Sequence, residues 1–311
     1  MKEVIHTENL TKIYGKERVV DNVNFSVKEG EIFGFLGLNG AGKTTTIRML
    51  LGMIVPTNGG VFLQGQKVQP KSIDIWAGVG NIVEKPYSYP ELTVEENLEI
   101  IGKLRGIKDK QRILWVMKKL NLENYRSMKT KNLSQGNAQR LGIAKAIIHG
   151  PKILILDEPT NGLDPAGVVE VRQLLLELAQ NFGVTVFLSS HKLEEISKIA
   201  TNIAIIHDGK LIKKIDTKQL ERQLKKTLLL DGHNKKEMKK VLSQSGYEIK
   251  HLEADSTERT LYLQLQSKEA INNPEKIVTL LVKNGYPPNF LKVEKEDLET
   301  YFLRTIEEMG D

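Results

Sequence analysis

The chain has 311 residues, of which 40% are hydrophobic and 27% are charged, and its formal net charge is +6. This length exceeds that of a usual single domain, so we expect a large domain and a smaller one, each with its own core. The absence of cysteine excludes disulfides and thiolate metal sites, and the six histidines are scattered rather than clustered.

The longest apolar runs, such as residues 153–156, are far below the ~18 residues needed to cross a bilayer. Residues 1–10 carry four charged or titratable side chains and lack the apolar stretch of an export signal. We therefore expect a soluble, cytoplasmic protein. Its positive charge would suit nucleic acid or an anionic membrane surface, but the lysines are dispersed beside acidic residues, as on solvated helix faces.

Short apolar runs alternate with helix-like stretches through about residue 215. Four runs lack the polar alternation of half-exposed strands and are predicted to be strands buried on both faces of a largely parallel sheet: 31–36, 153–156, 184–188 and 203–206. Residues 78–83 are also strand-like. Thr93 with Glu96 has the pattern of a capping box, and Pro165 suits a first helical turn, so a helix should begin at each. The pattern predicts an α/β domain.

After Asp216 the composition shifts towards Lys, Glu and Gln, and no acid/base or phosphate-binding motif follows. The predicted order is strand, helix, strand, strand, helix, strand, helix: 227–230, 235–245, 247–252, 260–265, 273–284, 290–293 and 295–308. This order fits a βαββαβ unit of ferredoxin-like type, so residues 216–311 are predicted to form a small α+β domain.

A phosphate-binding motif lies between the predicted strand 31–36 and the helical run 45–51. The sequence from Gly37 to Thr44 matches G-x-x-x-x-G-K-[ST] in the required strand–loop–helix context, although a glycine-rich turn is the alternative explanation. Backbone amides and the helix N-terminus would bind phosphate, Lys43 would reach the terminal phosphates, and the Thr44 hydroxyl would ligate Mg²⁺. The expected nucleotide-binding residues are Gly37, Asn39, Gly40, Ala41, Gly42, Lys43, Thr44 and Thr45.

Two carboxylates, Asp157 and Glu158, follow the predicted strand 153–156, at the strand end where α/β sheets place ligands. Asp157 would hold Mg²⁺, and Glu158 would accept the proton of an attacking water. A helix cap would explain such a pair taken alone. Combined with the phosphate loop, the pair indicates hydrolysis of ATP.

Further motifs in the expected order resemble those of ABC transporter ATPases over residues 3 to about 215. Residues 133–137, Leu-Ser-Gln-Gly-Asn, resemble the ABC signature, and residues 161–165, Asn-Gly-Leu-Asp-Pro, resemble the D-loop. His191 is similar to the switch histidine, and Tyr14 to the aromatic residue that stacks on adenine. Singly, each has an ordinary explanation as a helix cap, a loop residue or a surface aromatic.

The resemblance implies a P-loop ABC ATPase domain at 1–215, with a mixed sheet core and a helical subdomain at about 85–150, followed by the 216–311 domain. It also implies a homodimer in which each ATP–Mg²⁺ is covered by Ser134 and Gly136 of the other copy, with Lys43, Glu158 and His191 as catalytic residues. The partner would be a separate polytopic membrane permease, which would place the chain peripherally on the inner face of the membrane. No nucleic-acid partner is expected.

Two departures from the family pattern stand out. In the signature, Gln135 and Asn137 replace the usual Gly and Gln. After the strand-like 78–83, Glu84 replaces the glutamine that touches Mg²⁺ and the transport partner, which makes Glu84 a candidate metal ligand. Glutamate there, the chain length and the C-terminal extension resemble bacitracin- and lantibiotic-resistance exporters, and this suggests export of a peptide antibiotic.

Two alternatives to the exporter remain. A soluble ABC ATPase acting on ribosomes or DNA is disfavoured because such members usually carry tandem ATPase units or a long coiled coil, which this sequence lacks. A small-molecule kinase is disfavoured because the signature and His191 would have no function in it. For the exporter, Tyr87, Tyr89 and Leu92 are candidate docking residues for the membrane subunit, with local loop packing as the alternative.

Overall fold

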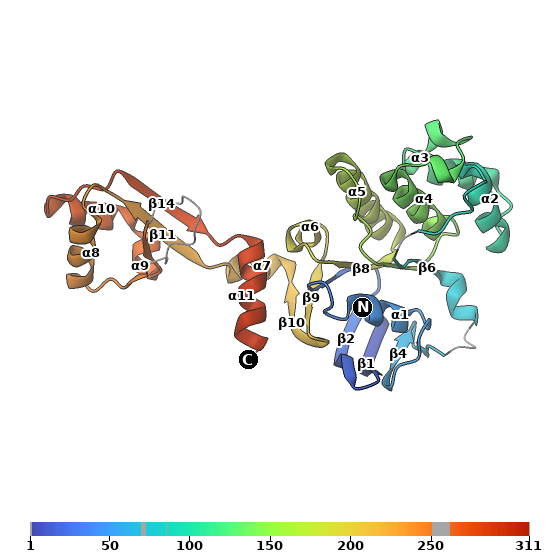
Figure 1. Ribbon diagram of the computed structural model, residues 1–311, viewed down its shortest axis with the longest axis horizontal. Coiled ribbons are helices and arrows are strands. Elements are labelled where there is room, and N and C mark those ends of the chain that lie inside the picture. Colours follow the sequence, from blue (N-terminus) through green and yellow to red (C-terminus); the bar gives the residue numbers. More distant parts are fainter. Residues whose placement is uncertain (1, 70–72, 85, 251–261, 311) are drawn as a thin grey trace. The chain divides into compact units, whose positions relative to one another are not determined.

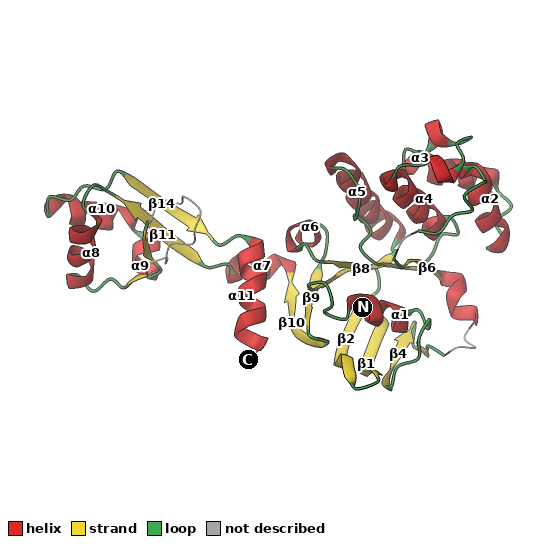
Figure 2. Cartoon of the chain, viewed as in Figure 1, coloured by secondary structure: helices red, strands yellow, loops and turns green. Residues whose placement is uncertain are grey.

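The computed structural model describes residues 2–69, 73–84, 86–250 and 262–310 (Figures 1 and 2). The chain forms two compact units. The first runs to Gln219 and includes the residues from Ile306 onward, and the second spans Leu220–Thr305. The chain passes between the units within helix α7 (Thr217–Gln223) and again within helix α11 (Leu298–Gly310).

A six-stranded sheet in the order β10-β9-β3-β8-β7-β6 forms the centre of the first unit. Its strands are β3 (Ile32–Leu36), β6 (Val79–Ile82), β7 (Ile153–Leu156), β8 (Thr185–Ser190), β9 (Asn202–His207) and β10 (Lys210–Asp216). All pairs are parallel except β9 with β10. The five strands expected from apolar composition are confirmed within two residues at each end. Parallel strands covered on both faces explain that composition.

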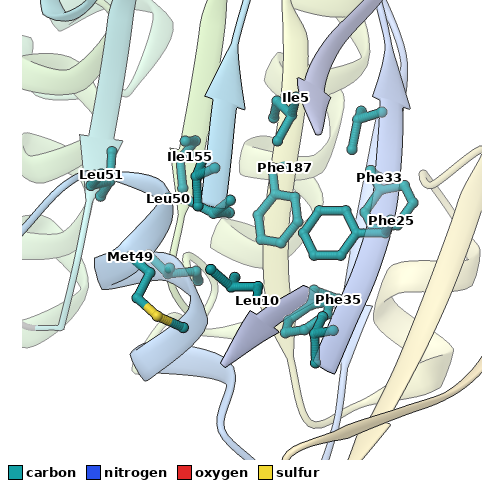
Figure 3. Packing of buried hydrophobic residues seen from close by; sticks show 14 of the residues in the cluster. Ile5, Leu10, Phe25, Phe33, Phe35, Met49, Leu50, Leu51, Ile155 and Phe187 are labelled. Carbon is teal, nitrogen blue, oxygen red and sulfur yellow. The ribbon is translucent and has the colours of Figure 1, made fainter. Parts of the chain in front are cut away.

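A second sheet of the first unit, antiparallel and in the order β2-β1-β4-β5, was not predicted. It consists of β1 (Glu3–Tyr14), β2 (Glu17–Lys28), β4 (Asn58–Leu63) and β5 (Gln66–Lys67). Phe25 from this sheet packs against Phe33, Phe35 and Phe187 of the six-stranded sheet, with ring centroids 5.5–5.7 Å from Phe25 (Figure 3). This aromatic core joins the two sheets, and α1 (Lys43–Leu50) adds Ile47, Met49 and Leu50 to it.

The helices of the first unit follow the capping signals. Thr93 and Glu96 form the predicted capping box before α2 (Val94–Leu104), and Asp164 caps α5 (Pro165–Phe182) by accepting from the Gly167 amide. The remaining helical segments are α3 (Lys110–Lys119), α4 (Gln135–Ile147), α6 (Leu193–Ser197) and the 3₁₀ turns Ile73–Gly78, Glu123–Tyr125 and Thr130–Asn132. In Figure 1, α2, α3 and α4 form one group above the β6 end of the sheet.

The second unit has the predicted ferredoxin-like order, except that a short helix, α9, precedes the predicted helix α10. Its antiparallel sheet, β12-β13-β11-β14, packs on helices around a small apolar core that includes Leu228, Leu230 and Met238. The elements are β11 (Lys226–Asp231), α8 (Lys235–Gln244), β12 (Ile249–Lys250), β13 (Leu263–Leu265), α9 (Lys268–Asn272), α10 (Pro274–Lys283) and β14 (Phe290–Lys295). The predicted strand residues 251–252 and 260–261 lie outside the described residues.

The start of the last helix was predicted wrongly. Residue 295 still belongs to β14, where it pairs with Lys226, and α11 begins only at Leu298. Asp297 marks the start of this helix as its N-cap, because its carboxylate accepts from the Thr300 amide (2.8 Å) and hydroxyl (2.9 Å). Across the chain, none of the described helices is both long and apolar enough to span a membrane.

Candidate nucleotide site

The predicted phosphate loop connects the end of β3 to the start of α1. Gly40 and Gly42 have φ angles of 83° and 100°, which glycine adopts readily. A Cβ at Gly42 would lie 2.7 Å from the Val19 carbonyl oxygen, and one at Gly37 would lie 2.6 Å from that of Ile206. Conformation therefore favours glycine at position 40, space requires it at 37, and both require it at 42. The resulting loop precedes a helix N-terminus, an arrangement that binds phosphate.

Lys43 is buried at the start of α1, with only 6% of its surface exposed. Its Nζ donates to the carbonyl oxygens of Gly37 (2.8 Å) and Leu38 (3.2 Å), and it lies 3.5 Å from Glu158 Oε1. The ammonium group thus lies between the loop and the proposed general base. A cation fixed there can stabilise negative charge on phosphate oxygens.

Asp157 anchors the loop to the end of β7. Thr44 Oγ1 donates to one of its carboxylate oxygens at 2.8 Å, and Ser189 Oγ donates to the other at 2.6 Å. A hydroxyl and a carboxylate at hydrogen-bond distance are oxygen ligands of the kind that Mg²⁺ prefers, and Mg²⁺ commonly takes its remaining ligands from phosphates and water. The described residues contain no cluster of three or more His, Cys, Asp or Glu side chains that would form a complete protein metal site.

Glu158 has the backbone conformation of a strained turn, with a φ of 48°. Its amide donates to Ser189 Oγ (3.0 Å), which fixes the turn, and its Oε2 lies 2.9 Å from His191 Nδ1. Two of the three proposed catalytic side chains, Lys43 and His191, therefore contact the carboxylate of the third. A carboxylate held this way is positioned to accept a proton from water.

These side chains line an open groove of about 740 Å³. Its lining residues are Val19, Leu38, Asn39, Gly40, Gly42, Lys43, Thr44, Thr45, Glu158, Asn161 and His191. Sequence reasoning missed two contributors. Val19 comes from the unpredicted β2. Ser189, fully buried behind Asp157, directly follows the predicted strand 184–188, whose apolar pattern gave no sign of a functional polar residue at its end.

Among the residues that the structure describes, seven predicted site residues lie outside this lining. Gly37, Ala41 and Asp157 are next to lining residues in the sequence, whereas Tyr14, Glu84, Ser134 and Gly136 are not. Tyr14, at the end of β1, is 47% exposed, with Lys12 Nζ 4.9 Å above its ring. Glu84 is ion-paired with Arg48. Ser134 caps α4 by accepting from the Asn137 amide, and Gly136 lies in the first turn of that helix. One copy of the chain thus brings together the phosphate loop, Glu158 and His191, but not the signature.

Residues 20–161 match the ABC transporter family. The chain is 41% identical to the bacitracin transport ATP-binding protein BcrA of Bacillus licheniformis over 98% of both sequences. It is 36% identical to the lantibiotic transport ATP-binding protein SrtF of Streptococcus pyogenes over 67% of this chain and 89% of that one.

Solved structures show the same fold. A dimeric ATP-binding cassette in a post-hydrolysis state with ADP and Pi matches 68% of this chain and 98% of its own, with a TM-score of 0.64 and 28% identity. The family match over residues 20–161 includes the loop and the acidic pair. The chain therefore belongs to the ABC transporter family, as an ATP-binding subunit that hydrolyses ATP.

Proposed function

We propose that this ATPase drives an exporter of a peptide antibiotic of the bacitracin type, acting with a separate membrane subunit. The likeness to bacitracin and lantibiotic transport ATP-binding proteins supports this substrate class, and the first of these likenesses extends over nearly the whole chain. In this proposal ATP-driven closure of two ATPase copies is coupled to the membrane subunit near the exposed Tyr87 and Tyr89, whose rings pack edge to face at 5.8 Å.

The groove of one chain is open, and its described lining lacks the signature residues. This observation carries the proposal of a homodimer. Ser134 and Gly136 lie outside the groove of their own chain, among the described residues. A second copy, placed head to tail, would supply them to the γ-phosphate. The α4 N-terminus would add positive potential there. Two solved structures of a similar cassette are dimeric, which agrees with this arrangement.

For the cofactor, we propose Mg²⁺ bound through Thr44 and Asp157, with Glu84 as a third candidate ligand. Glu84 has a φ of 59°, and its pairing with Arg48 would have to open before its carboxylate could reach a metal. Glu84→Gln removes the charge and keeps the shape. If the Mg²⁺ dependence of ATP hydrolysis and the coupling to transport are both unchanged, Glu84 has no such role.

The dimer is tested with Glu158→Gln, which removes the base but keeps the side-chain shape. ATP hydrolysis should fall by ~10²- to 10⁴-fold, the usual cost of losing a general base, while an ATP-dependent dimer should accumulate in size-exclusion chromatography. Adding Ser134→Ala should weaken that dimer, and Ser243→Ala, on the exposed surface of the second unit, should not. A variant that stays monomeric with ATP, or hydrolyses it normally, would refute the scheme.

Export is tested in the organism that encodes the chain. Deleting its gene should raise sensitivity to bacitracin, and the wild-type gene should restore resistance while Glu158→Gln should not. Affinity purification from membranes should recover a polytopic protein with the wild-type chain. Recovery with ribosomes instead, and no change in antibiotic sensitivity, would favour the soluble ATPase alternative.

A further inference from the structure

Strand β14 forms a long uncovered edge of the second unit. Among the described residues it pairs only with β11, so its outer row of backbone amides and carbonyls faces away from the sheet. β14 has six residues. An edge of this length is a template for pairing with another strand.

The same strand carries apolar side chains that its own unit covers incompletely. Leu291 and Val293 pair with Leu230 and Leu228, so they point to the same face of the sheet as those core residues. Leu228 and Leu230 are fully buried, but Leu291 and Val293 are 38% and 39% exposed. The core of the second unit therefore ends at β14 with apolar surface left open.

We propose that β14 pairs antiparallel with β14 of a second copy of the chain, about a two-fold axis at Val293. The two four-stranded sheets would become one continuous sheet. Val293 would lie opposite Val293 of the other copy, and apolar surface on both sides of the axis would be buried. The interface is isologous, because both copies contribute the same strand.

The sequence of β14, Phe-Leu-Lys-Val-Glu-Lys, is complementary to itself in this register. Lys292 lies opposite Glu294 of the other copy, and Glu294 opposite Lys292. A shift of one residue either way would place Val293 opposite a charged residue. A shift of two would oppose two lysines or two glutamates, which destabilises a strand pair.

Two opposite charges already form an ion pair at the centre of this edge. Lys292 Nζ lies 2.8 Å from Glu294 Oε1 on the same strand, with both side chains about half exposed. In the pair of strands, two such ion pairs would meet across the axis as a network of four alternating charges. Because these groups are solvent-exposed, the attraction should weaken as salt concentration rises.

This interface does not depend on ATP, so it can be tested apart from the proposed ATP-bound dimer. The chain has no cysteine, so a single introduced cysteine is its only thiol. In nucleotide-free protein carrying Val293→Cys, the two thiols would face each other at the axis, with Cβ atoms about 4.5–5.5 Å apart. Mild oxidation should then give a disulfide-linked dimer in most chains, also in a Ser134→Ala background.

Two controls match this variant. Leu291→Cys lies on the same face but would be opposite Lys295 of the other copy, and Val282→Cys is 52% exposed on α10. Both should cross-link at least tenfold more slowly than Val293→Cys. Equal rates for Val293→Cys and Val282→Cys, or cross-linking of Val293→Cys only to another protein, would overturn the proposal.

Charge reversal tests the register. Adding Lys292→Glu to Val293→Cys places two glutamates opposite each other and should reduce cross-linking at least fivefold. Adding Glu294→Lys as well restores opposite charges and should restore cross-linking. Equal cross-linking in all three proteins, with unchanged melting temperatures, would show that β14 does not pair in this register.

Discussion

Ser189 holds the proposed metal ligand Asp157 and the backbone turn at Glu158 in place, although it touches no substrate in our scheme. Its Oγ donates to Asp157 Oδ1 at 2.6 Å and accepts from the Glu158 amide at 3.0 Å. The side chain is fully buried. Ser189→Ala therefore removes one hydrogen bond to a carboxylate and leaves a backbone amide unpaired in the strained turn at Glu158.

The expected cost follows from these two contacts. A hydrogen bond to a charged group contributes about 1.5–3 kcal/mol, and an unsatisfied donor costs about 1–3 kcal/mol. Because the two effects overlap in one side chain, we expect a loss of about 2–4 kcal/mol of unfolding free energy. ATP hydrolysis should fall by ~10- to 100-fold, as for residues that orient a metal ligand, and more Mg²⁺ should be needed.

Guanidinium denaturation and a Mg²⁺ titration of ATP hydrolysis measure these effects. Ser190→Ala is the matched control, because Ser190 is also buried at the end of β8, but its hydroxyl accepts, among the described residues, only from the Lys192 amide (3.0 Å). It should lose about 1 kcal/mol and leave the Mg²⁺ requirement unchanged. If the two variants behave alike, Ser189 does not position Asp157.

Three further predictions concern buried groups elsewhere. Burial lowers the pKa of Lys145 from 10.5 to about 8. Between these two pH values the unfolded chain binds more protons than the folded chain, so the free energy of unfolding should rise with pH there. Lys145→Met should abolish that rise, as measured by denaturation curves at several pH values. Burial is the largest single effect on Glu296 and opposes its ionisation, but hydrogen bonds from Arg304 and the Lys225 amide, together with the charges of both residues, outweigh it and lower the pKa. Arg304→Ala should cost about 3 kcal/mol, and wild type should lose this contribution as pH falls through the lowered pKa. A Cβ at Gly142 would lie 2.5 Å from Pro86, so Gly142→Ala should cost about 1–3 kcal/mol in melting experiments.

Two of these predictions have a control variant, and the prediction for Arg304 has a contradicting outcome. Lys152→Met, at an exposed lysine, should keep the wild-type pH dependence, and a similar curve for Lys145→Met would contradict the role of burial. A Cβ at Gly78 would lie 3.7 Å from the nearest atom, Gln64 Nε2, so Gly78→Ala should lower the stability far less than Gly142→Ala. An Arg304→Ala protein as stable as wild type at pH 7 would show that Glu296 does not need its partner.

Much of the fold could be predicted because its signals are local. The buried parallel strands are short apolar runs, the helices begin at capping residues such as Thr93 and Asp164, and the order of the second unit follows from alternating patterns. β1 and β2 were missed for a physical reason. Bulges between residues such as Thr7 and Leu10 break the two-residue period by which exposed strands are recognised.

The sequence by itself determined the phosphate loop, the Asp157–Glu158 pair and the family, because a motif of adjacent residues fixes its own backbone and chemistry. Only the tertiary structure decided what surrounds that motif. Contacts between residues far apart in the chain brought Ser189 behind Asp157, His191 against Glu158 and Val19 over the groove, and turned Glu84 towards Arg48. Such contacts depend on how strands pair and pack, and no local spacing encodes them.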